Sequence, residues 1–131
     1  MLILNHPQIA PLTLCYVASK EEVEKTLPND FLILNCDNSA NTLALARLLK
    51  ENNTSYAAMP TSVYEALTLV NLNVRFLLTR NLEMAKTLQK LAEIYLFDCK
   101  ILLCVNKDIE SQMQSDIEAA ANLGIDGVLC H

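Results

Sequence analysis

Residues 101–130 read ILLCVNKDIESQMQSDIEAAANLGIDGVLC, and this stretch decides the fold. It opens with a continuous apolar run at 101–105, which is typical of a strand buried on both faces. Apolar side chains then recur at the spacing of a helix with one buried face, at Ile109, Met113, Ile117, Ala120 and Ala121. A second apolar run at 127–130 completes a strand–helix–strand unit. Such a unit predicts two parallel strands joined by a crossover helix.

The same alternation extends over the rest of the chain. Further short apolar runs lie at 12–17, 31–36, 56–59 and 74–78, and helical patterns lie between them, with the clearest at 63–70 and 82–95. Residues 1–4 form either an edge strand or a contact segment. The order predicts an α/β fold with right-handed crossovers, in which an open parallel sheet of five or six strands forms a three-layer αβα sandwich. A chain of 131 residues is too short for an eight-fold barrel, which needs about 250, and we expect a single domain, 1–131.

The expected ends of the helices have recognisable chemistry. Side chains suited to cap or charge a first turn are Ser19 with Glu22, Ser62 with Glu65, Asn81 with Glu83, and Asp108 with Glu110. Residues suited to end a helix are Pro28, the pair Asn52-Asn53, and Gly124, which is expected to take a left-handed conformation.

Glycine and histidine usage excludes several classes of enzyme. The only glycines are Gly124 and Gly127, whereas a Walker loop, a dinucleotide fingerprint and a nucleophile elbow each need closely spaced glycines near a phosphate or a sharp turn. The only histidines, His6 and His131, lie near the chain ends, so no internal imidazole is available for acid–base work. We therefore expect a protein without catalytic residues and without a cofactor.

Charge and hydropathy restrict the partners. The chain has 10 basic and 15 acidic residues, which gives a net charge of −5, and the basic residues do not cluster. Nucleic acid and anionic membranes are therefore not expected as partners. The apolar runs are far shorter than the ~18 residues of a membrane span, and the first residues do not resemble a secretory signal. We expect a cytoplasmic protein.

The five cysteines point to the same compartment. They form no Cys-x-x-Cys pair, and all but one lie inside or at the end of apolar runs, as small buried hydrophobic residues do in a reducing compartment. Two alternatives remain open. Cys36 or Cys130 can be a reactive thiol, and Cys36, Asp37, Cys130 and His131 can form a metal site. An inert buried thiol is the favoured interpretation, and no metal is expected.

Candidate ligand-binding residues follow the strands, because ligands of open parallel sheets bind beyond the carboxyl ends of the strands. These residues are Asp37, Asn38, Arg80 and Lys107. Arg80 offers a planar fork for a carboxylate or a phosphate, Lys107 a point charge, and Asp37 a base. The alternative, which we favour, is that such polar residues only cap helices. Lys107 is a poor Schiff-base nucleophile because the neighbouring Asp108 favours its charged form.

Three segments resemble parts of known families. Residues 29–35 and 74–81, within 13–91, resemble strands of a response-regulator receiver domain, the first carrying the phosphoacceptor and the second ending in Lys-Pro. In this chain Asn35 stands in the phosphoacceptor position and Arg80-Asn81 replaces Lys-Pro. The resemblance therefore implies only a flavodoxin-like or receiver-like layout, and it excludes phosphotransfer to Asn35. Residues 123–129 are similar to a βα repeat of phosphate-binding barrels.

These observations favour a non-catalytic cytoplasmic α/β domain that has a binding or regulatory role through protein–protein contacts, as a homodimer. Tyr95, Leu96 and Phe97 place three large apolar side chains in a row at a helix end, which suggests a self-association surface. The alternative is a small enzyme or sensor that binds an anionic metabolite through Arg80 and Lys107, with Asp37.

Overall fold

The computed structural model describes residues 1–9 and 11–131, and in that part of the chain strands alternate with helices as the sequence predicts. The strands are β1 (Leu2–Leu4), β2 (Leu14–Val17), β3 (Phe31–Leu34), β4 (Ala57–Ala58), β5 (Phe76–Thr79), β6 (Lys100–Val105) and β7 (Gly127–Cys130). The helices are α1 (Lys20–Glu24), α2 (Ser39–Glu51), α3 (Val63–Val70), α4 (Leu82–Tyr95) and α5 (Glu110–Asn122). The fold is α/β with a parallel sheet.

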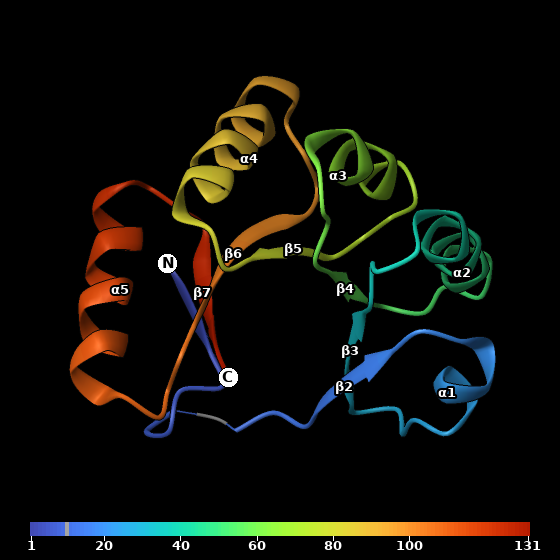
Figure 1. The fold of residues 1–131 in the computed structure, drawn as a ribbon, viewed down its shortest axis with the longest axis horizontal. Coiled ribbons are helices and arrows are strands. Elements are labelled where there is room, and N and C mark those ends of the chain that lie inside the picture. Colours follow the sequence, from blue (N-terminus) through green and yellow to red (C-terminus); the bar gives the residue numbers. More distant parts are fainter. Residues whose placement is uncertain (10) are drawn as a thin grey trace. The chain divides into compact units, whose positions relative to one another are not determined.

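The strand order corrects the prediction in three respects. The described residues form seven strands, where five or six were expected, in the order β1-β7-β6-β5-β4-β3-β2. From β2 to β7 each strand lies beside the next one in the chain, which differs from the flavodoxin-like order 2-1-3-4-5. Right-handed crossovers that all advance in one direction put the connecting helices on one face of the strands. Within residues 13–77, α1, α2 and α3 lie along one side of their strands (Figure 1), where an αβα sandwich would have helices on both sides.

The chain divides into two compact units, and it passes from one to the other inside β5. The first unit comprises Met1–Leu12 and Leu78–His131, and we call it the terminal unit. The second comprises Thr13–Leu77, and we call it the central unit.

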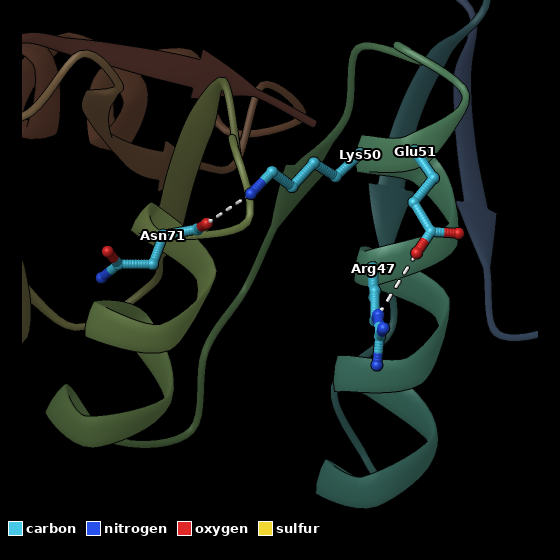
Figure 2. Close-up of polar contacts among 4 residues, drawn as sticks. All are labelled: Arg47, Lys50, Glu51 and Asn71. Carbon is cyan, nitrogen blue, oxygen red and sulfur yellow. Dashed lines mark hydrogen bonds and ion pairs between the residues drawn. The ribbon is translucent and has the colours of Figure 1, made fainter.

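The central unit contains β2, β3, β4 and the start of β5, and Figure 1 shows α1, α2 and α3 along the same side of these strands. Its core includes Leu34, Ala46 and Ala58, which are fully buried. Figure 2 shows how α2 meets the end of α3: Lys50 Nζ donates a hydrogen bond of 3.3 Å to the carbonyl oxygen of Asn71.

The terminal unit contains β1, β7, β6 and the end of β5, with α4 packed on β6 and α5 packed on β6 and β7. Its turn from α5 to β7 is fixed by Asp126. One carboxylate oxygen of Asp126 accepts a hydrogen bond from the backbone N–H of Ile101 (2.9 Å), and the other accepts one from Gln89 Nε2 (3.1 Å). The backbone N–H of Asp126 donates back to Gln89 Oε1 (2.9 Å). This side-chain network joins α4, β6 and the start of β7.

Most of the predicted helix ends are confirmed. Ser19, Ser62 and Asn81 are N-caps whose side chains accept backbone hydrogen bonds. The prediction for Asp108 is wrong: α5 has Ile109 as its N-cap and no side-chain cap bond. Asp108 lies instead in a turn, where its own N–H donates to Asn106 Oδ1 at 2.9 Å.

The far ends of the helices also agree with the sequence. Asn52 is the C-cap of α2, α1 ends before Pro28, and Gly124 follows α5 with a φ of +71°. The described residues other than glycine with a positive φ are Asn5, Asn53, Asn73 and Leu96. Of the helices within residues 1–9 and 11–131, none has the length and the apolar composition of a bilayer-spanning segment.

Candidate functional site

The carboxyl ends of the strands in the terminal unit bring three side chains to one edge. Arg80 follows β5, Lys107 follows β6, and His131 follows β7. Backbone bonds continue the pairing beyond the strands, since the N–H of His131 donates to the Val105 carbonyl (3.0 Å) and the N–H of Lys107 donates to the His131 carbonyl (3.1 Å). The backbone at Lys107 and His131 is thus held in a defined position. We call Arg80, Lys107 and His131 the basic edge.

The electrostatics of His131 show that these groups act on one another. Burial lowers the pKa of its half-buried imidazole below the ordinary value of 6.5, and Arg80 lowers it further. Lys107 acts in the same direction as Arg80, whereas Asp108 opposes them. Arg80 and Lys107 are both exposed, and neither forms an ion pair with another described residue. His131 is therefore largely neutral at pH 7, beside two cations.

The helices that start at this edge differ in their caps. At the start of α4, Asn81 Oδ1 accepts the N–H of Met84 at 2.9 Å. At the start of α5 no side chain performs this task. The first N–H groups of a helix carry partial positive charge, so the start of α5 adds to the positive potential of Lys107 just before it. The arrangement suits a small anion.

The other two predicted site residues lie in the central unit. Asn38 is the N-cap of α2, and its Oδ1 accepts the N–H of Asn41 at 3.2 Å. Asp37 is exposed next to it, and its N–H donates to Asn35 Oδ1 at 3.0 Å. The structure thus gathers Arg80 and Lys107 in one unit, and it places Asp37 and Asn38 in the other, where Asn38 caps a helix.

His131 is the member of the basic edge that the sequence-based site omitted. Its position directly after the last apolar run was the available signal, because that position places it at the carboxyl end of a strand.

A buried carboxylate in the central unit was also missed. Glu65 is only 3% exposed, and its Oε1 accepts hydrogen bonds from the N–H (2.9 Å) and the hydroxyl (3.2 Å) of Thr61. The Ser62–Glu65 spacing predicted a capping box, but the carboxylate bonds to the residue before the N-cap. Burial, together with the negative charge of Glu65, raises the pKa of the neighbouring Cys36 thiol to about 12. Cys36 is therefore a protonated, weakly nucleophilic thiol.

A metal site finds no support among the residues that the structure describes, because no group of three or more His, Cys, Asp or Glu side chains is arranged to hold an ion there. Cys36 and Asp37 belong to the central unit, whereas Cys130 and His131 belong to the terminal unit. Burial raises the pKa of Cys130, and Lys107 opposes the rise.

Comparison with protein-family models gives no match for this chain, and comparison with curated proteins gives none either.

Proposed function

We propose that this protein is a binding or regulatory domain that recognises a small anion, a phosphate or a carboxylate, at the basic edge. The observation that carries the proposal is the position of Arg80, Lys107 and His131 directly after β5, β6 and β7, with the backbones of Lys107 and His131 bonded to each other. A guanidinium fork and an ammonium group at one edge, beside a helix start without a side-chain cap, supply the donors that such anions need.

Calorimetric titration with inorganic phosphate, sulfate and citrate tests this proposal. Arg80→Ala and Lys107→Ala each remove a charged donor, so we expect each to weaken binding by roughly 10- to 100-fold, which corresponds to about 1.5–3 kcal/mol. Lys90→Ala is the matched control, because Lys90 is an exposed lysine of α4 outside this edge. The proposal fails if none of the three anions binds, or if the Arg80→Ala and Lys107→Ala proteins bind as the parent does.

Self-association is a second candidate function, favoured by the end of α4. Ile94, Tyr95 and Leu96 are 58%, 68% and 82% exposed, and Leu96 closes the helix in a left-handed conformation with φ 53°. Phe97, the third residue of the predicted surface, is only partly exposed. A homodimer through this helix end would cover large apolar side chains that are otherwise hydrated.

Sedimentation equilibrium of the parent chain and of Leu96→Glu tests the homodimer. We expect the parent to dimerise and the glutamate, which is costly to bury, to give a monomer. Leu123→Glu, at another exposed leucine, is the control that should remain dimeric. A monomeric parent chain at all concentrations would exclude this function. We also propose a cytoplasmic location, which is supported by the burial of Cys36, Cys99, Cys104 and Cys130 as thiols, since thiols stay reduced in that compartment.

A further inference from the structure

A pocket of about 520 Å³ lies in the terminal unit at the amino ends of its strands, the opposite end from the basic edge. It is bounded by the starts of β1 and β6, the end of α5 and the turn into β7. Its volume falls within the roughly 300–1,000 Å³ that small-molecule sites occupy. The pocket is therefore large enough for a metabolite of a few carbon atoms.

Small residues on one wall keep this pocket open. Gly124 lines it, and a Cβ built there would meet no atom within 4 Å. Ala121, one turn earlier on α5, contributes only a methyl group. The larger apolar side chains of the lining are Met1 and Leu2, which are exposed, and Ile125, which is buried. This wall suits an aliphatic group.

Two opposite charges also line the pocket. Asp126 is held in place by the bonds from Gln89 and Ile101, and each carboxylate oxygen retains a second lone pair. Lys100 is exposed and forms no ion pair with any residue that the structure describes. Both charges act on one neighbouring group, the Cys99 thiol. Its pKa is raised to about 11, mainly by burial, and Asp126 contributes to the rise whereas Lys100 opposes it. The carbonyl end of α5 adds negative potential near Asp126.

We propose that this pocket binds a free α-amino acid with an aliphatic side chain. The ammonium group of the ligand pairs with Asp126 and the end of α5, its carboxylate pairs with Lys100, and its side chain packs on Leu2 and Ile125. The opposite charges of Asp126 and Lys100 match the two charges of a zwitterion. A ligand with only a carboxylate would be repelled by Asp126, and a ligand with only an amine would be repelled by Lys100.

Calorimetric titration of the full chain with L-leucine, L-isoleucine, L-valine and L-methionine tests this site. We expect at least one of them to bind with a Kd below about 10 mM. For the amino acid that binds, the analogue without the ammonium group and the analogue without the carboxylate should each bind at least about tenfold more weakly. Binding by none of the four, or equal binding of either analogue, overturns the proposal.

Variants locate the binding in this pocket. Lys100→Gln should weaken it by about tenfold or more, whereas Lys90→Gln, at an exposed lysine outside the pocket, should not. Ala121→Phe should abolish binding by filling the space, and Ser115→Phe, at an exposed position earlier on α5, should not. Amide chemical shifts of Gly124 and Asp126 should move on titration. Arg80→Ala should leave this binding unchanged, which separates the pocket from the anion site. Unaltered binding in both Lys100→Gln and Ala121→Phe overturns the assignment.

Discussion

At the scale of single residues, Gly127 shows how closely two strands approach. A Cβ at this position would lie 2.5 Å from the carbonyl oxygen of Leu2 and 2.9 Å from Leu102 Cδ2. Gly127→Ala must therefore displace β1 from β7, and we expect a loss of about 1–3 kcal/mol in the free energy of unfolding, measured with urea.

The second glycine provides a matched comparison for this prediction. Gly124 needs a positive φ but has open space around it, and asparagine already takes positive φ at three other positions. Gly124→Asn should cost less than about 1 kcal/mol. Equal stability of the Gly127→Ala protein and the parent would contradict the packing of β1 on β7. The sequence places Gly124 after a helix and Gly127 at the start of a strand, but it does not reveal that β1 lies against Gly127. The reason is that β1 and β7 come from opposite ends of the sequence.

His131 predicts how pH changes anion binding. Its pKa lies below 6.5, so acid below that pH adds a third positive charge to the basic edge, and affinity for sulfate should rise as the pH falls from about 7.5 to 5.5. Without an anion, the lowered pKa contributes stability above pH 6.5 that is lost as the pH falls, because the unfolded chain binds the proton more readily. Sulfate is the suitable probe since its own charge is constant over this range.

Calorimetric titration at the two pH values checks this prediction. His131→Gln should flatten the pH dependence, and His6→Gln, at the other histidine, should leave it in place. A rise that persists in His131→Gln would assign the effect to another group.

At the scale of elements, the N-terminus of α5 lacks a capping side chain, and adding one should stabilise the protein. Its N-cap, Ile109, is 54% exposed, and its apolar side chain accepts no backbone N–H of the first turn. Ile109→Ser should stabilise the protein by about 1 kcal/mol in urea unfolding, because a hydroxyl at this position satisfies an N–H of the first turn. Ile94→Ser, at an equally exposed isoleucine inside α4, should give no gain. If both variants behave alike, the gain does not come from capping.

The Asp126 network predicts a larger loss. Asp126→Ala leaves the N–H of Ile101 and the amide of Gln89 without their acceptors, and the expected cost is about 1–3 kcal/mol in the free energy of unfolding. Asp116→Ala, which removes a surface bond to Gln112, should cost little. Comparable losses in the two variants would contradict a special role for this turn.

The elements themselves were largely predictable. Each apolar run from 12–17 to 127–130 contains all or most of one strand, since buried parallel strands need continuous apolar sequence. The helices between them follow the apolar spacing. The caps at Ser19, Ser62 and Asn81 also follow from local chemistry. The prediction that Asp108 caps α5 was wrong because the Asn106 side chain accepts the N–H of Asp108 and forms a turn there. The spacing of apolar and capping residues does not reveal such a competing local bond.

At the scale of the whole molecule, the thiols report on opening of the fold. Cys36, Cys104 and Cys130 are buried, as their places in apolar runs predicted, and Cys99 is buried although it lies outside those runs. Burial raises the pKa of Cys99 and Cys104 to about 11. Cys15 is partly exposed. A colourimetric disulfide reagent should therefore modify Cys15 first in the native protein, and all five thiols together in denaturant. Fast modification of two or more thiols in the native protein would show that the core is not closed.

The strand order and the site were less predictable than the elements. Alternating strands and helices are compatible with several orders, because the handedness rule links the face on which a helix lies to the side on which the next strand is added, but it does not fix that side. The candidate residues depended on that order. Arg80 and Lys107 share a unit because they follow successive strands, β5 and β6, whereas Asp37 follows β3.

The left-handed positions have a consequence for the unfolded chain. Asn5, Asn53 and Asn73 hold positive φ angles where many proteins use glycine. An asparagine explores fewer backbone conformations than a glycine before folding, so less disorder is lost when the turn forms. Having few glycines therefore has two effects in this protein. It excludes glycine-rich phosphate-binding loops, and it lowers the entropic cost of folding.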